Sequence, residues 1–299
     1  MCTRKKTPVS LQRYSRMFVI LLVFDSFLIA PAVADTYFDE VSSMPEVIAA
    51  RAYDSQAEIN ADIHANNSAN RVRPPVYDAE IGGARWTISS GSGSIAIQDQ
   101  LRPTFPNVSS GNLLVIWEAR WDPAFPQNEN GLETHKAFQL SREGSGDERR
   151  IEVRTRFSQA SPPAVAKVDV RTYIWSPAQQ PLSGQSRDFT IKGGKWTRFW
   201  AFVDFSSREF SLWIADEDTD PVRVFDKRQF SSMSGGLNNF WFEFNSSQSR
   251  SGGASLNVWG RNFIALRNVS NVESIVSGGT VDGGNAVVAP MPPQNVIAE

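Results

Sequence analysis

The segment RIEVRTRF, residues 150–157, alternates without a break between charged side chains and apolar or β-branched ones. Successive side chains of a β-strand point to opposite faces of a sheet, so the segment predicts a strand with one core-facing side and one polar side. The core-facing set is Ile151, Val153, Thr155 and Phe157, and the polar set is Arg150, Glu152, Arg154 and Arg156. This strand sets the pattern for the surrounding sequence.

Ten more short runs rich in Val, Ile, Phe, Trp and Thr follow one another between Gly82 and Val269, separated by clusters of Gly, Ser, Pro, Asp and Asn. Such runs, bounded by turn residues, are typical of β-strands. They cover residues 84–89, 113–121, 136–142, 167–175, 188–192, 196–205, 209–216, 222–226, 240–245 and 256–266. The sequence therefore predicts an all-β fold, a two-sheet jelly-roll β-sandwich over residues 82–269, rather than a barrel with a polar lumen.

The first residues of the chain have the pattern of a signal peptide. Residues 1–17 are basic, residues 18–34 are almost wholly apolar, and Ala32-Val33-Ala34 offers small residues for a signal peptidase. We predict a signal peptide over residues 1–34 and a secreted or periplasmic location after cleavage near Ala34. No other stretch has the ~20 apolar residues that a membrane span requires. Cleavage also removes Cys2, the only cysteine, so disulfides are not expected.

Two segments flank the predicted sandwich. Residues 35–81 are predicted to form a short helix and a linker, because Pro45 opens the helix-like run PEVIAA and Asn-rich sequence follows. Residues 270–299 are rich in Gly and Pro and lack core-forming side chains, so they are predicted to be a flexible tail.

Composition excludes several classes of function. The 30 Lys and Arg residues balance 32 Asp and Glu residues, so no overall positive charge favours a nucleic-acid partner. Two histidines and one cysteine leave few possible zinc sites. We therefore predict no cofactor, and the oligomeric state is left open.

An acidic cluster at Asp216-Glu217-Asp218 and Asp220 suggests at most a calcium ion. Carboxylate oxygens are suitable calcium ligands, but the spacing does not match a calcium-binding loop. A polar hairpin turn is the expected structure, and calcium remains possible but unsupported.

In the later strands, aromatic residues occupy the same alternating positions as the polar residues and should therefore lie on the same face of the sheet. A face that combines Trp, Tyr, Arg and Glu suits a polysaccharide, because indole rings stack on sugar C–H groups and guanidinium groups hold carboxylates in bidentate geometry. Tryptophans with this parity are Trp175, Trp200, Trp213, Trp241 and Trp259. The predicted substrate-binding residues are Glu152, Arg154, Arg156, Arg171, Trp175, Trp200, Trp213, Trp241 and Glu243.

A structural explanation of the same residues stays open. Tryptophan is usually buried, so loops, residues 35–80 or the second sheet could cover these rings. Arg154 and Arg171 could form cross-strand ion pairs with Glu152 and Asp169, each worth a few tenths of a kcal/mol.

Several segments together resemble the concanavalin A-like lectin and glucanase superfamily. The resemblance covers about residues 82–269 and implies a jelly roll whose concave sheet binds or cleaves polysaccharide. It is carried by Leu132–Phe138, Ile151–Arg156, Trp196–Trp213, Phe240–Asn245 and Trp259–Leu266.

Within that superfamily, residues 150–154 (RIEVR) look like the Arg-Ser/Thr-Glu-Leu/Val-Arg motif of polysaccharide lyases of the alginate lyase type, except at the second position. The family's Gln-Ile/Val-His and Tyr-x-Lys-x-Gly-x-Tyr motifs have no counterpart, and neither has the Glu-x-Asp-x-x-Glu signature of the glucanases. The resemblance therefore implies the fold more strongly than the catalysis.

The leading hypothesis is an exported protein that binds a uronate-containing polysaccharide. The alternative is a lyase in which Arg150, Arg154 or Arg171 neutralises the uronate carboxylate while His135 or Tyr173 moves protons during β-elimination. A non-catalytic adhesion or structural module of the cell envelope is a third possibility. An unsaturated sugar product would distinguish the lyase from the other two.

Overall fold

The computed structural model describes residues 36–64, 71–72, 74–88, 97–98, 100–123, 133–142, 149–158, 165–174, 187–217, 219–230, 235–242 and 256–278. The predicted signal peptide lies outside the described residues.

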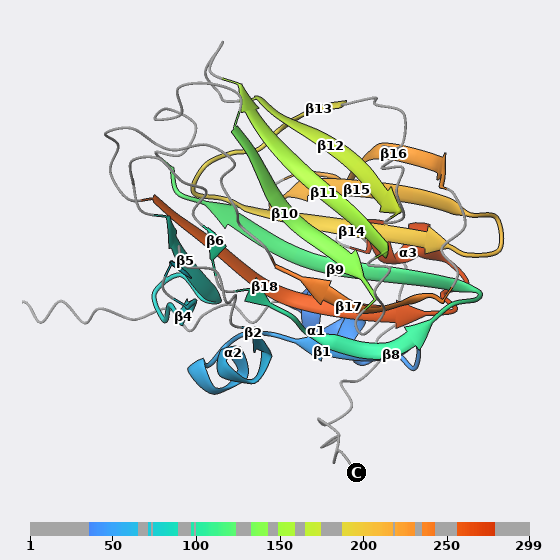
Figure 1. Cartoon of the computed structure of the whole chain (residues 1–299), viewed down its shortest axis with the longest axis horizontal. Helices are drawn as coiled ribbons and strands as arrows, with labels where there is room; N and C mark the ends of the chain where they lie inside the picture. The colour runs from blue at the N-terminus through green and yellow to red at the C-terminus, as the bar shows by residue number, and fades with distance from the viewer. Residues whose placement is uncertain are drawn as a thin grey trace, which may run out of the picture. The chain divides into compact units, whose positions relative to one another are not determined.

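Two antiparallel sheets form a β-sandwich, and Figure 1 shows the strands of the six-stranded sheet in front of those of the eight-stranded sheet. The eight-stranded sheet has the order β16 (Val222–Gln229), β15 (Glu209–Asp216), β14 (Trp196–Asp204), β9 (Asn112–Trp121), β18 (Leu256–Arg267), β5 (Ala84–Ile88) and β4 (Val76–Tyr77), with β1 (Val47–Arg51) paired to β18. The six-stranded sheet has the order β13 (Arg187–Thr190), β12 (Val165–Ile174), β11 (Arg149–Ser158), β10 (Glu133–Ser141), β17 (Leu237–Trp241) and β8 (Thr104–Val108).

Smaller elements complete the described chain. Two short pairs join β2 (Ile63–His64) to β7 (Gln100–Leu101) and β3 (Arg71–Val72) to β6 (Ile97–Gln98). The helices are α1 (Thr36–Ser42), α2 (Gln56–Asp62) and α3 (Val272–Ser277).

The predicted all-β fold is confirmed, and each of the eleven predicted runs corresponds to a strand of the two large sheets. The strand β8 was not predicted, because Pro106 interrupts its pattern, and an edge strand is a position where a sheet tolerates proline. The helix predicted from Pro45 is wrong: Val47–Arg51 forms β1, where pairing with β18 overrides the local helix signal. The helices α1 and α2 precede and follow β1 in the sequence.

The core lies between the two sheets. Trp117 of β9 stacks on Phe199 of β14 with ring centroids 4.9 Å apart, and it also contacts Phe138 and Phe240 of the facing sheet. Gly260 of β18 lets Phe242 approach closely, since a Cβ at that position would lie 2.9 Å from the Phe242 ring. Burial of these large aromatic rings is the main stabilising contribution to the sandwich.

A second apolar cluster lies on the outer side of the eight-stranded sheet. Ile275 and Val276 of α3 and Tyr37 of α1 are buried there against Leu114 and Ile116 of β9. The helix α3 falls within residues 270–299, which the sequence predicted to be flexible, so at least this part of the segment belongs to the fold.

Candidate functional site

The outer face of the six-stranded sheet carries two neighbouring rows of polar and aromatic residues, here called the polar rows. They occupy register positions across β17, β10, β11 and β12, and the row between them, which contains Phe240, Leu140 and Ile151, belongs to the core. The first row is Asn239, Ser141, Arg150 and Tyr173, and the second is Trp241, Gln139, Glu152 and Arg171. None of these eight positions holds an aliphatic residue.

The side chains at the centre of the polar rows are buried although they face away from the core. Ser141 Oγ donates a hydrogen bond to Asn239 Oδ1 at 2.9 Å, and both residues are almost fully buried, as are Gln139 and Glu152. Within the part of the chain that the structure describes, Asn239 Nδ2 has no hydrogen-bond acceptor. Burying an unpaired amide N–H is costly, so this donor is an unsatisfied polar group at the centre of the polar rows.

The edge next to β17 adds Arg102, which the sequence analysis missed. The backbone N–H of Phe242 donates to the carbonyl of Leu101 at 2.9 Å, which brings this segment beside β17. The Arg102 guanidinium lies 3.7 Å from the centroid of the Trp241 ring, and its Nε donates to Gln100 Oε1 at 2.7 Å. The buried Leu101 between two polar residues was the available sequence signal, but the strand is too short to stand out.

The predicted catalytic residues occupy different registers. Arg150 and Tyr173 are direct partners in the first polar row. His135 is not in either row: a bulge between Lys136 and Phe138 shifts β10, and His135 pairs with Thr155. A β-bulge changes which residues share a face, and strand alternation in the sequence does not reveal it.

The remaining predicted binding residues are placed as follows. Arg154 pairs with Asp169 and Arg156 with Lys167, so the arginines of β11 continue beyond the two polar rows. Trp175 and Glu243 lie outside the described residues.

Two predicted binding residues, Trp200 and Trp213, belong to the other sheet. They lie on β14 and β15, only 2% and 5% exposed, in the apolar cluster with α1 and α3. Trp200 Nε1 donates to the Tyr37 hydroxyl at 2.6 Å. The prediction that they share one face with Trp241 is therefore wrong, because alternation assigns a residue to one side of a strand without saying which sheet holds the strand.

The remaining half of the outer face of the eight-stranded sheet is polar. Glu118 of β9, which is only 3% exposed, lies at its centre. Its carboxylate accepts hydrogen bonds from Arg198 Nε and Arg261 Nε, each at 2.7 Å, and from Asn262 Nδ2 at 3.0 Å. Burial opposes ionisation, but the two guanidinium groups outweigh it and hold the pKa of Glu118 below its ordinary value. Asn262 reaches Glu118 from a bulge in β18, where its φ of 55° is in the left-handed region.

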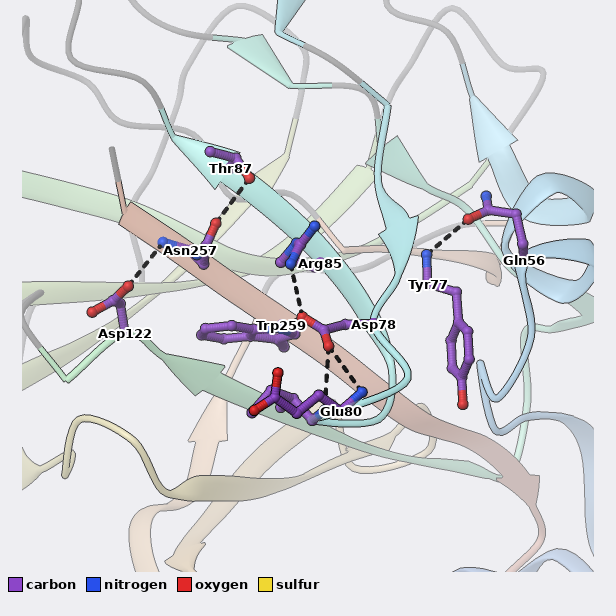
Figure 2. A network of polar contacts seen from close by, with 10 residues as sticks. Gln56, Tyr77, Asp78, Glu80, Arg85, Thr87, Asp122, Asn257 and Trp259 are labelled. Carbon is purple, nitrogen blue, oxygen red and sulfur yellow. Dashed lines mark hydrogen bonds and ion pairs between the residues drawn. The ribbon is translucent and has the colours of Figure 1, made fainter. Parts of the chain in front are cut away.

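Asp78 organises the neighbouring strands, as Figure 2 shows. It accepts from Trp259 Nε1 at 3.0 Å, forms an ion pair with Arg85 at 3.0 Å, and caps the turn at Glu80 through a backbone N–H. Although burial opposes ionisation, the hydrogen bond from Trp259 and the other donors leave the pKa of Asp78 lowered.

The acidic cluster near Asp216 shows other contacts than those of a metal site. Thr197 Oγ1 donates to Asp216 Oδ1 at 2.9 Å, and Lys195 forms an ion pair with Glu217 at 2.8 Å, while Asp218 is outside the described residues. Among the residues that are described, no group of three His, Cys, Asp or Glu side chains is placed to hold a metal ion.

No helix in the described ranges is long and apolar enough to cross a membrane.

No protein-family model matches the sequence, and no curated protein matches it. Solved structures do resemble it. The PL-14 alginate lyase from Aplysia kurodai is 12% identical over 74% of this chain and 99% of its own, with a TM-score of 0.49. Alginate lyase Aly36B, solved with an alginate tetrasaccharide, is 14% identical over 73% and 93% of the two chains, with a TM-score of 0.48.

A GH131 β-glucanase catalytic domain from Podospora anserina is 14% identical, covers 65% of this chain and 75% of its own, and has a TM-score of 0.43. Identities this low concern the fold and not the activity. The two antiparallel layers and their strand order form a two-sheet β-sandwich, the fold class that the sequence predicted.

Proposed function

We propose that the protein binds a uronate-containing polysaccharide on the outer face of the six-stranded sheet. The observation that carries this proposal is the pair of polar rows, in which eight register positions across four strands hold only polar and aromatic residues. The outer face of a sheet needs no such uniform composition for folding. Amides, hydroxyls and guanidinium groups together match the hydroxyls and carboxylates of an acidic sugar chain.

The chemistry of each part of the rows supports this ligand. Arg150 and Arg171 are register neighbours of Tyr173 and Glu152, so positive charge accompanies both rows. Asn239 offers an unused amide donor, and the hydrogen bond from Ser141 fixes its orientation. A donor held in place before binding loses less conformational freedom when a sugar hydroxyl arrives.

The predicted export of the chain fits this function. Polysaccharides of cell surfaces and extracellular matrices are found outside the cytoplasm, where a signal peptide over residues 1–34 would deliver the protein. The secreted or periplasmic location is part of the proposal, and cell fractionation tests it.

Affinity electrophoresis against alginate, pectin, hyaluronan and neutral glucans tests the binding proposal. We expect the wild-type protein to be retarded by at least one uronate polymer and by none of the neutral glucans. Arg150→Gln should weaken retention about tenfold or more, the size expected when one charged hydrogen bond is lost. Arg267→Gln, at an exposed position of β18, is the matched control. Unretarded migration in every polymer would overturn the proposal.

A second candidate function, β-elimination by a polysaccharide lyase, is favoured by one observation. Arg150 and Tyr173 are direct register partners, so the backbone pairs a residue type that can neutralise a carboxylate with one that can transfer a proton. Incubation with each uronate polymer should then produce the absorbance of an unsaturated sugar, and Tyr173→Phe should abolish it. Binding without that absorbance leaves the protein a binding module.

A further inference from the structure

A row of alternating tryptophan and arginine crosses the outer face of the eight-stranded sheet. Trp196 of β14 pairs with Arg120 of β9, Arg120 with Trp259 of β18, and Trp259 with Arg85 of β5. This row, here called the Trp-Arg row, lies on the other sheet from the polar rows and adjoins the Glu118 network.

The arginines around this row outnumber the carboxylates that pair with them. Glu118 is shared by Arg198 and Arg261, and Asp78 pairs with Arg85. Arg120 differs from these arginines, because no carboxylate within the described part of the chain forms an ion pair with it.

The next acidic residue on the same face does not neutralise Arg120. Asp122 follows it two positions along the chain, and Asp122 Oδ2 accepts a weak hydrogen bond from the Asn257 backbone N–H at 3.4 Å. In the described residues, Asp122 makes no ion pair with Arg120. The guanidinium is thus a half-buried charge with no counter-ion among the residues that the structure describes.

The Arg120 side chain is also only partly satisfied by hydrogen bonds. Its Nε is buried and has no acceptor in the described structure, and the same is true of Arg85 Nε on the other side of Trp259. The Arg120 guanidinium lies 5.6 Å from the centroid of the Trp259 ring. Trp259 is itself fixed by its hydrogen bond to Asp78, which Figure 2 shows.

We propose that Arg120 is the anchor of an anion-binding site that takes the carboxylate group of an acidic ligand. A guanidinium group presents planar pairs of N–H donors that match a carboxylate, and such a bond is strongest where water is partly excluded. Arg85, whose side chain is 37% exposed, lies on the other side of Trp259, but Asp78 already neutralises its charge, so the charge of the site comes from Arg120.

The ligand is recognised here by its carboxylate and not by stacking. Trp196 and Trp259 are only 5% and 6% exposed, and the Arg261 guanidinium covers the Trp196 ring at 4.1 Å. The indole faces are therefore occupied. A free sugar acid and a uronate unit of a polymer present the same group, and the experiment distinguishes them.

Calorimetric titration of the full-length protein with glucuronate, an oligogalacturonate and glucose tests the site. We expect Arg120→Gln to weaken binding of at least one of the two acids about tenfold or more, and glucose not to bind at this site. If Arg120→Gln weakens the binding of glucuronate, a free sugar acid is sufficient as the ligand. If it weakens only the binding of the oligogalacturonate, the site requires a uronate unit within a polymer. Equal affinities of wild type and Arg120→Gln for both acids would overturn the proposal.

A stability measurement separates this site from a structural role of Arg120. Because its charge has no partner in the described structure, Arg120→Gln should unfold at the same urea concentration as the wild type or a higher one. Arg198→Gln, which removes a partner of Glu118, should unfold at a lower concentration. If Arg120→Gln is destabilised as strongly as Arg198→Gln, the guanidinium is structural and the proposal fails.

A further variant keeps this inference separate from the proposed function. In Arg150→Gln, which weakens the polar rows, the part of acid binding that depends on Arg120 should persist, because Arg150 lies on the six-stranded sheet. Loss of that binding in Arg150→Gln would place the acid on the polar rows and overturn the second site. Loss of polysaccharide retention in Arg150→Gln alone would leave both proposals standing.

Discussion

The outer face of the eight-stranded sheet has two halves that share the same strands but differ in chemistry. Along β9 the apolar Ile116 is followed on the same face by the charged Glu118, and along β14 Trp200 is preceded by Arg198. The helices α1 and α3 bury the first half, whereas ion pairs and hydrogen bonds organise the second. The boundary falls within one two-residue step of a strand, so a single β-strand can contribute both to a packed interface and to a charged network.

Tryptophans are buried in both halves for different reasons. Trp200 is covered by α1 and donates its N–H to Tyr37, whereas Trp196 is covered by the guanidinium of Arg261. Both rings are largely hidden from water. A tryptophan two positions from an arginine in the same strand is therefore compatible with a packed helix interface and with a charged surface, and only the neighbouring elements decide between them.

The largest effect is expected from Glu118→Gln, which breaks the charged half at its centre. Removing one partner of a buried ion pair leaves the other charges uncompensated and typically costs about 3–5 kcal/mol. Arg198 and Arg261 would both lose their carboxylate. Urea unfolding measures the change in the free energy of unfolding.

The matched control for this variant is Glu209→Gln. Glu209 accepts a hydrogen bond from Gln229 at an exposed position of the same sheet. Exposed substitutions of this kind usually change stability by less than about 0.5 kcal/mol. Similar losses in the two variants would show that Glu118 is not the centre of the charged half.

Acid should weaken the same network without a mutation, with a smaller effect, because the lowered pKa of Glu118 keeps part of its carboxyl population ionised below the ordinary value. The pKa of Glu118 in the folded protein is lowered from its ordinary value of 4.5, since Arg198 and Arg261 outweigh the effect of burial. Its stabilising contribution is therefore fully present above pH 4.5 and is lost as the pH falls through the lowered pKa. Unfolding curves measured below pH 4.5 should show a smaller loss of stability in Glu118→Gln than in the wild type. Equal losses would contradict the prediction.

The sequence predicted the strands more reliably than the surfaces. Alternation in β11 assigned Ile151 and Val153 to the core and Glu152 to the opposite face, as the structure confirms. Alternation is a local property, so it detects sidedness wherever one face is buried.

The partners of each face depend on contacts between distant residues. Trp213 and Trp241 have the same sequence pattern, but Trp213 lies in the cluster with the helices and Trp241 lies under Arg102. The bulge in β10 and the Asn262 bulge in β18 are also invisible to alternation, because each inserts one residue into an otherwise regular strand. The charges of Glu118 and Arg120 in a central strand were a signal that could have revealed the second polar surface.

The covered half should respond to Tyr37→Phe, with an effect below that of Glu118→Gln. The Tyr37 hydroxyl accepts from Trp200 Nε1 at 2.6 Å and donates to the carbonyl of Ile275 at 3.0 Å, so it joins α1, β14 and α3. Leaving buried polar groups unpaired costs about 1–3 kcal/mol. Urea unfolding of Tyr77→Phe is the control, because the Tyr77 hydroxyl makes no hydrogen bond in the described residues. A neutral Tyr37→Phe would mean that apolar contacts alone hold the helices.

The smallest effect is expected at the far end of the charged half, where Figure 2 shows Thr87 beside Asn257. Thr87 Oγ1 donates to Asn257 Oδ1 at 2.8 Å, and both residues are only half-buried. Water replaces much of a hydrogen bond at such a site, so Thr87→Val should cost about 0.5–1.5 kcal/mol in urea unfolding. Thr104→Val, at an exposed position of β8, should be neutral and serves as the control. If Thr87→Val lowered the free energy of unfolding as much as Glu118→Gln, the prediction would be wrong. Water would then be excluded from the polar contacts as far as the end of β5, and the charged half would be as inaccessible to water as the half beneath the helices.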